Sequence, residues 1–134
     1  MTSLPVQPAE PKDSDSGEPA IRAVRRFYHL VDSGDCQGLA AMFAADAEYR
    51  RPGYELMEGP EGLLSFYSRD RTIRSGQHTL TTLLTDGHHV GVFGEFHGVL
   101  KDGRPLDLRF ADRFIVRPDG LFSSRDTYFF APLV

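Results

Sequence analysis

The sequence predicts an α+β fold in which a curved antiparallel sheet forms a cone-shaped barrel wrapped around three N-terminal helices. The first half of the chain shows the apolar spacing of amphipathic helices, and the alternation typical of strands begins near residue 78. Asp-Gly pairs divide this second half into segments of strand length, with turns at Asp86-Gly87, Asp102-Gly103 and Asp119-Gly120. Helices followed by an antiparallel meander are typical of α+β proteins, and such a cone encloses a pocket between sheet and helices.

The helical part begins with a helix predicted from about Glu18 to Ser33. Its apolar stripe consists of Ile21, Val24, Tyr28 and Val31. Gly34 ends this helix, and Asp35 can cap a short second helix. A short strand at Ala47–Arg51 and a third helix that opens at Gly59-Pro60-Glu61 complete the first half.

Four longer strands are predicted after the helices. They cover Thr79–Thr85, His88–Leu100, Leu106–Arg117 and Leu121–Phe130. The segment before the first helix, residues 1–17, is rich in Pro, Ser and acidic residues, so it cannot bury enough apolar surface to offset the entropy of ordering. We therefore expect a disordered tail at residues 1–17 and a single domain at residues 18–134.

Composition excludes several function classes. The net charge is −4 and the arginines are scattered, which argues against a nucleic-acid-binding surface. Cys36 is the only cysteine, so no internal disulfide is expected. The first residues lack the basic start and apolar run of a signal peptide, and no segment approaches the ~20 apolar residues of a membrane span. We expect a cytoplasmic protein that binds neither membrane nor nucleic acid.

One alternating segment carries the first candidate site. Glu95 and His97 point to the same side of their predicted strand, and a carboxylate beside an imidazole tunes proton transfer near neutral pH. The next strand presents an apolar face with a single carboxylate, Asp112, between Phe110 and Phe114. If both faces look into one cavity, the three polar residues meet there. Their spacing matches no metal signature, so we expect neither a metal ion nor another cofactor.

Three segments resemble the nuclear-transport-factor-2-like superfamily, which contains ketosteroid isomerases, limonene-type epoxide hydrolases and SnoaL-like polyketide cyclases. The segments are the helix–"GD"–"LFADDA"-like stretch from Val24 to Ala47, the helix Glu58–Tyr67, and Phe110–Phe129 with Asp112-Arg113-Phe114 and Asp126-Thr127-Tyr128-Phe129. Together they span residues 20–134. The resemblance implies the cone-shaped, cystatin-like fold. The superfamily includes proteins with and without catalytic activity.

Compared with the isomerases, Asp112 matches an oxyanion-hole aspartic acid that is kept neutral in an apolar site, and Tyr67 matches a supporting pocket tyrosine. Phe27 replaces the oxyanion tyrosine, and Arg51 replaces the catalytic base.

Compared with the epoxide hydrolases, Tyr49 matches a water-binding tyrosine and Arg51 replaces an asparagine, while their central Arg and Asp fall on Glu95 and His97. The catalytic carboxylate of the cyclases falls near Asp126. Counting from Gly120 places Thr127 rather than Asp126 on the pocket face, although a slip of one residue would reverse this.

The sequence therefore predicts a cofactor-free acid/base enzyme that acts on a hydrophobic small molecule, as a polyketide-type cyclase or isomerase. A limonene-type epoxide hydrolase or a non-catalytic ligand-binding protein are the alternatives. His97 would transfer the proton, and Glu95 would orient the imidazole of His97. Asp112 would stabilise an oxyanion or protonate a leaving oxygen. The expected substrate-binding residues are Tyr49, Arg51, Phe27, Tyr67, Phe110, Thr127 and Asp126.

Two further expectations concern surfaces. His78, His88 and His89 lie near predicted turns, so we expect them in solvent. We expect the sheet face that does not line the pocket to carry Phe93, Phe96 and Val116. Because an apolar face of this size is unlikely to stay uncovered, we expect a homodimer packed through it.

Overall fold

The computed structural model describes residues 6–131 of the chain. Its elements are α1 Val6–Ser33, α2 Cys36–Ala40, β1 Phe43–Arg50, β2 Met57–Glu58, α3 Gly59–Ser65, β3 Ile73–Asp86, β4 His89–Leu100, β5 Pro105–Val116 and β6 Phe122–Phe129. A π-helical turn at Phe66–Asp70 continues α3. The predicted α+β class is confirmed, with the helices first and the long strands after them.

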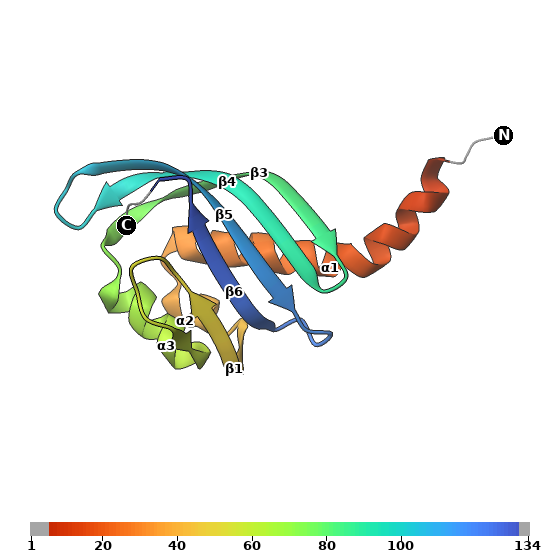
Figure 1. Ribbon diagram of the computed structural model, residues 1–134, viewed down its shortest axis with the longest axis horizontal. Coiled ribbons are helices and arrows are strands. Elements are labelled where there is room, and N and C mark those ends of the chain that lie inside the picture. The colour runs from red at the N-terminus through yellow and green to blue at the C-terminus, as the bar shows by residue number, and fades with distance from the viewer. Residues whose placement is uncertain (1–5, 132–134) are drawn as a thin grey trace.

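All six strands belong to one curved sheet that does not close into a barrel. Their order is β2-β1-β6-β5-β4-β3, and β1 runs parallel to β6 while the other neighbours are antiparallel. In Figure 1 the long strands arch over α1, and α2 and α3 lie together at one end of it. The inner face of the sheet therefore faces the helices, as the predicted cone requires.

The first helix is longer than predicted. α1 begins at Val6 rather than near Glu18, and residues 1–5 lie outside the described part of the chain. The expected disordered tail at residues 1–17 stays a prediction. Figure 1 shows this first portion of α1 projecting beyond the sheet. A low apolar content argues against packing but not against helix, because extending an existing helix avoids the cost of nucleation. Close packing is evident at Gly17, where a Cβ atom would lie 2.8 Å from Oγ1 of Thr85.

The predicted caps and turns are confirmed. Asp35 caps α2, since its side chain accepts a hydrogen bond from the backbone N–H of Gly38 at 2.8 Å. α3 begins at Gly59 as expected. All three Asp-Gly turns are present, and the glycines at two of them, Gly103 and Gly120, adopt φ of 92° and 90°. These left-handed conformations explain why glycine occupies the turns.

An aromatic core joins α1 to the sheet. Phe27 is fully buried, and its ring packs edge-on against Phe43, Phe114 and Phe122 at centroid distances of 5.7, 5.6 and 5.9 Å. Such edge-to-face pairs add about 0.5–1.5 kcal/mol each beyond the burial of their area. Phe27 therefore anchors α1 to β1, β5 and β6.

The faces of the sheet differ from the prediction in one respect. Phe96 and Val116, which we assigned to the outer face, are buried on the inner face with exposed fractions of 3% and 4%. Phe93 does lie on the outer face and is half exposed. The inner face of β4 therefore carries its even-numbered residues, and the outer face carries the odd-numbered ones.

We find no helix in the described part of the chain that combines the length and the apolar composition needed for a membrane crossing.

Candidate functional site

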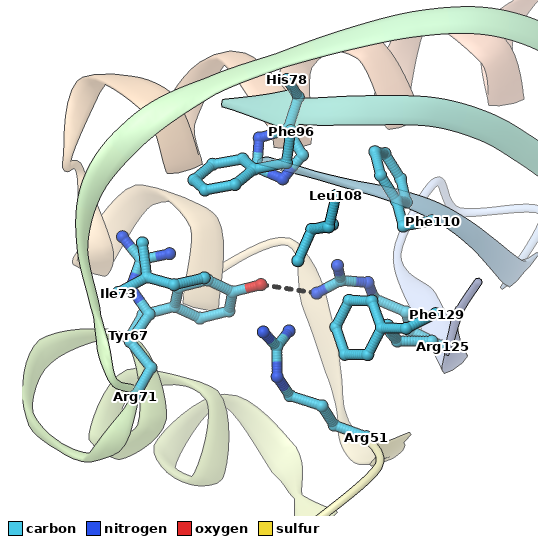
Figure 2. Close-up of a pocket in the computed structure, with 11 residues that line it drawn as sticks. Arg51, Tyr67, Arg71, Ile73, His78, Phe96, Leu108, Phe110, Arg125 and Phe129 are labelled. Atoms are coloured by element: carbon cyan, nitrogen blue, oxygen red, sulfur yellow. Dashed lines mark hydrogen bonds between the residues drawn. The ribbon is translucent and has the colours of Figure 1, made fainter. Parts of the chain in front are cut away.

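A cavity lies between the inner face of the sheet and the end of the molecule where α3 and its π-helical turn pack (Figure 2). It encloses about 380 Å³ of empty space when the part open to solvent is counted, but only about 20 Å³ admits the centre of a water molecule. A single water needs about 10–15 Å³ by this measure. The empty cavity is therefore narrow, and a substrate larger than a few atoms must displace side chains at its mouth.

The cavity has an apolar side and a polar side. Ile73, Phe96, Leu108, Phe110 and Phe129 form the apolar side. The polar side consists of Arg51, Tyr67, Arg71, Arg125 and Thr127, while His78 lies across the cavity beside Phe96. No Asp or Glu is among the lining residues. In Figure 2 the guanidinium of Arg51 points into the space between Tyr67 and Phe129. This combination suits an apolar molecule that carries a polar group at one end.

Directly behind the polar side lies Asp112, whose side chain is fully buried. Arg125 Nη2 donates to Asp112 Oδ2 at 2.9 Å, Thr127 Oγ1 donates to Oδ1 at 2.5 Å, and the hydroxyl of Tyr28 donates to Oδ2. Because three donors converge on it, the network suits an ionised carboxylate, which only accepts hydrogen bonds. Asp112 therefore does not line the cavity but holds two residues that do.

A relay of hydroxyl groups connects this carboxylate to Arg51. Thr127 donates to Asp112, so its oxygen accepts from the hydroxyl of Tyr49 at 2.8 Å. The hydroxyl of Tyr49 in turn accepts from Nη1 of Arg51 at 3.0 Å. The chain of donors fixes the orientation of each hydroxyl, since every oxygen except the carboxylate both donates and accepts.

Burial and charge tune the ionisation of this network. Burial raises the pKa of the Tyr28 phenol well above its ordinary value, and the negative charge of Asp112 raises it further. For Arg125, burial lowers the pKa, but the adjacent Asp112 more than offsets this, so that the pKa lies well above its ordinary value. Tyr28 therefore stays a neutral donor and Arg125 stays a cation at any pH near neutrality.

The hydroxyl of Tyr67 is positioned by Arg125, and its O–H remains available to donate a hydrogen bond into the cavity. Nη1 of Arg125 donates to the Tyr67 hydroxyl at 2.6 Å, the bond drawn in Figure 2. Because that oxygen accepts from Arg125, its own O–H can donate to a molecule in the cavity.

His78 and Asp32 form a pair on the opposite side. Nδ1 of His78 lies 2.6 Å from Oδ1 of Asp32, and the backbone N–H of His78 donates to Oδ2 of the same carboxylate at 2.9 Å. The side chains are only 13% and 19% exposed. A carboxylate at Nδ1 favours the tautomer with its proton there, which leaves the lone pair on Nε2. His78 lines the cavity, so this nitrogen can serve as a proton acceptor.

Four of the residues that were predicted to bind substrate line this cavity. Arg51, Tyr67, Phe110 and Thr127 line the cavity, and Tyr49 lies directly behind them with its hydroxyl on Thr127 and Arg51.

Besides Tyr49, two of the predicted substrate-binding residues do not line this cavity. Phe27 is a core residue, and the guanidinium of Arg125 lies over its ring at 4.7 Å. Asp126 points to the other face of β6, where it pairs with Arg113 at 2.8 Å and with Arg50 at 3.5 Å. As the counting from Gly120 indicated, Thr127 rather than Asp126 faces the pocket. Asp126 instead lines a shallower surface hollow that shares Arg51 and Thr127 with the cavity.

The expected meeting of Glu95, His97 and Asp112 in one cavity is wrong. Glu95 and His97 do lie side by side, with His97 Nε2 3.4 Å from Glu95 Oε1, but their side chains are 48% and 57% exposed on the outer face. His97 also bonds Asp107 across the strand pair at 2.7 Å. In the β4–β5 pairing Asp112 lies opposite Val92, and directly opposed residues share a face. The two faces therefore separate Asp112 from the other two residues.

Four functional candidates escaped the sequence prediction: Arg125, Tyr28, His78 and its partner Asp32. Arg125 was not singled out, although it lies two residues before Thr127 and so on the same face of the strand. Tyr28 was seen only as part of an apolar stripe. His78 was expected in solvent, but it lies inside β3 because that strand begins at Ile73, and its contact with Asp32 joins residues far apart in sequence. Of these, only Arg125 had a local signal.

Among the side chains that the structure describes, no three His, Cys, Asp or Glu gather in an arrangement that could hold a metal ion.

Comparisons with known proteins agree with the fold. A family model described as a SnoaL-like domain matches residues 24–124. A search of curated protein sequences gave no match.

Solved structures resemble this one at low sequence identity. A candidate polyketide cyclase from Xanthomonas campestris pv. campestris matches with a TM-score of 0.76 and 22% identity, over 84% of this chain and 91% of that one. An LEH-like epoxide hydrolase from M. tuberculosis matches with a TM-score of 0.73 and 20% identity, over 84% of this chain and 83% of that one. A protein with a ketosteroid isomerase-like fold from Catenulispora acidiphila matches with a TM-score of 0.72 and 23% identity, over 79% of this chain and 83% of that one. At these identities the likeness extends to the fold, while the chemistry must be argued from the residues of the cavity.

Proposed function

The chain belongs to the SnoaL-like domain family, and on that premise we propose that it is a cofactor-free acid/base enzyme that acts on a hydrophobic small molecule, as a polyketide-type cyclase or isomerase. The observation that carries the proposal is the His78–Asp32 pair on the wall of the cavity, with Nδ1 of His78 2.6 Å from the carboxylate. A positioned imidazole is the commonest general base in enzymes and contributes about 10²–10⁴-fold to a rate.

The proposed reaction begins with removal of a proton from carbon. Nε2 of His78 takes the proton next to a carbonyl group, the C–H bond electrons form the enolate, and the negative charge moves to the carbonyl oxygen. In an isomerisation His78 returns the same proton to another carbon. In a cyclisation the enolate carbon attacks a second carbonyl group, and the proton passes from His78 to the new alkoxide. Either sequence balances without a further reactant.

The opposite side of the cavity supplies donors for the enolate oxygen. The O–H of Tyr67 is available because its oxygen accepts from Arg125. Arg51 adds a guanidinium whose Nη1 is held by Tyr49 at 3.0 Å. Donors fixed in place before the reaction stabilise developing charge without reorganisation, and removing one typically costs about 10²–10³-fold. In this scheme Asp112 is a positioning residue, since it acts through Arg125 and Thr127.

Hydrolytic opening of an epoxide is the second candidate. It is favoured by the room for a single water between the polar residues, about 20 Å³ for its centre. His78 would deprotonate that water, and the O–H of Tyr67 would protonate the epoxide oxygen as its C–O bond breaks. The product would contain one oxygen atom from solvent, whereas cyclisation and isomerisation incorporate none.

We also propose that the protein is a cytoplasmic homodimer. The supporting observation for the dimer is an exposed aromatic group on the outer face of the sheet, formed by Phe93, Tyr128 and Phe130.

The proposed function can be tested with 2-tetralone, a bicyclic ketone with exchangeable protons beside its carbonyl group. In D₂O, NMR measures how fast deuterium enters that position. The protein should accelerate exchange, and His78→Gln should remove most of the acceleration, because glutamine preserves size and polarity but cannot accept the proton. Cyclohexene oxide in H₂¹⁸O tests the second candidate through the label in the diol.

The matched control is His97→Gln, which changes an exposed histidine on the outer face. It should leave the exchange rate within about twofold. Exchange that is equally fast with and without the His78 imidazole would overturn the proposed function. A ligand-binding protein without activity is the interpretation that would then remain.

A further inference from the structure

Among the residues that the structure describes, two cations on the cavity wall have no acidic partner. Arg51 and Arg71 line the cavity, and no carboxylate of the described residues lies within ion-pair distance of either guanidinium. Arg125 differs from them, because Asp112 neutralises it at 2.9 Å. The polar side of the cavity therefore carries an excess of positive charge.

The surroundings compensate these charges only in part. The guanidinium of Arg51 lies 5.0 Å from the ring centre of Phe66 and 5.1 Å from that of Phe129, and that of Arg71 lies 5.0 Å from the ring centre of Tyr67. Such contacts stabilise a cation but do not saturate its N–H groups. Nε of Arg51 is buried without a hydrogen-bond partner among the described residues. A partly buried guanidinium normally finds an anion.

The two charges also repel one another. Burial lowers the pKa of Arg71, Tyr67 raises it, and the positive charge of Arg51 lowers it again, so that it lies below its ordinary value. Both guanidinium groups remain protonated at neutral pH, since arginine does not lose its proton in proteins. An anion placed between them would remove this repulsion and complete their hydrogen bonds.

We propose that the cavity binds hydrophobic carboxylic acids, with the carboxylate held by Arg51 and Arg71 and the apolar body against Phe96, Leu108 and Phe110. A carboxylate fits because its two oxygens match the parallel N–H groups of a guanidinium. The carboxylate is an anchor at the polar side and is not itself the group that reacts. When Arg51 holds this carboxylate, the O–H of Tyr67 is the donor that remains for the enolate oxygen. This inference deepens the proposed function by naming its substrate class, and it rests on that function only for the claim that the bound acid is a substrate.

Benzoate and benzamide are suitable probes because they share size and shape and differ in charge. NMR-detected titration measures dissociation constants into the millimolar range. Benzoate should bind the unmodified protein at least tenfold more tightly than benzamide. Arg51→Gln and Arg71→Gln should each weaken benzoate at least tenfold and leave benzamide within twofold. Arg51→Lys, which keeps the charge but loses the paired N–H groups, should give an intermediate loss.

Arg74→Gln is the matched control, since Arg74 is exposed on β3 beside the cavity residue Ile73. It should change neither dissociation constant. Equal affinity for the two probes, or no benzoate binding at 10 mM (a concentration of the order used for millimolar ligands), would overturn the inference, and the comparison with unmodified protein does not depend on any variant folding. His78→Gln should leave benzoate binding within twofold. Loss of exchange activity and loss of benzoate selectivity therefore report on the two proposals separately.

Discussion

At the scale of single residues, the buried ion pair between Asp112 and Arg125 organises the polar side of the cavity. The carboxylate orients Arg125 and Thr127, Arg125 orients Tyr67, and Thr127 orients Tyr49. Each of these contacts lies where water cannot compensate for a lost partner. The pair therefore matters for stability and for the shape of the site at once.

Asp112→Asn should lower the free energy of unfolding by about 3–5 kcal/mol, because it leaves the charge of Arg125 buried without its counter-ion. Urea unfolding followed by circular dichroism measures this. Replacing both partners, as Asp112→Leu with Arg125→Met, should recover much of the loss, since no uncompensated charge remains. Asp107→Asn, an exposed change on the same strand, should stay within about 0.5 kcal/mol. Equal effects of Asp112→Asn and Asp107→Asn would contradict the role of the pair.

His97 on the outer face should titrate above its ordinary value. Its hydrogen bond to Asp107 raises the pKa most, the partial loss of hydration lowers it, and Glu95 raises it further. A raised pKa means that the charged form is stabilised in the folded protein. That contribution is complete below the unfolded value of about 6.5 and disappears as the pH rises through the raised folded value. NMR titration should show the shift, and Asp107→Asn should move the pKa back towards 6.5. An unchanged pKa in Asp107→Asn would contradict the assigned cause.

At the scale of elements, the sequence contained enough information to place the faces of both β4 and β5. The turn glycines and alternating residues located β4, β5 and β6, and Phe110, Asp112 and Phe114 were assigned correctly to the inner face of β5, although Val116 was not. Pairing across the turn at Asp102-Gly103 places Phe110 opposite Gly94, and opposed residues share a face. Applying that rule to β4 would have moved Glu95 to the outer face.

The His78–Asp32 pair could not be predicted in the same way. β3 contains two register shifts, between Ile73 and Ser75 and between Leu80 and Thr82, so simple alternation does not determine which residues face inward. The contact with α1 also depends on how the sheet curves over that helix. Local pattern thus determined which elements form, while long-range packing determined which side chains meet in the cavity.

Close packing between β3, β4 and β5 gives a prediction for these elements. A Cβ atom at Gly94 would lie 2.4 Å from the carbonyl oxygen of Thr79 and 3.1 Å from the ring of Phe110. Gly94→Ala should therefore cost about 1–3 kcal/mol through overpacking. Gly91→Ala on the same strand should be neutral or slightly stabilising, because a Cβ there meets nothing within 4 Å. Thermal and urea unfolding compare the two variants, and similar losses in both would contradict the packing argument.

At the scale of the whole molecule, the first portion of α1 extends away from the domain (Figure 1). A protein that begins at Gly17 should keep its melting temperature within about 2 °C, since few contacts would be lost. It should also keep its affinity for benzoate. A larger fall in melting temperature, measured by differential scanning calorimetry, would mean that residues before Gly17 pack on the domain.

The outer face of the sheet gives the last prediction, which concerns assembly. Phe93, Tyr128 and Phe130 are 48%, 57% and 79% exposed, and they lie around one shallow hollow on β4, β5 and β6. Phe93 and Tyr128 flank Ala111 from both sides, so the apolar surface is continuous across the three strands. A stable dimer buries about 800 Å² per partner, which a sheet face of this kind can supply.

Sedimentation at micromolar concentration should therefore show a homodimer. Phe93→Asp should shift it to monomer without unfolding it, because the charge enters a surface that is exposed in the isolated subunit but desolvated in the dimer. Phe93→Leu keeps the surface apolar and should remain dimeric, which separates loss of the interface from loss of the aromatic ring. A monomer for the unmodified protein would show that this face stays in solvent. A dimer that survives Phe93→Asp would instead place the contact on another surface of the molecule.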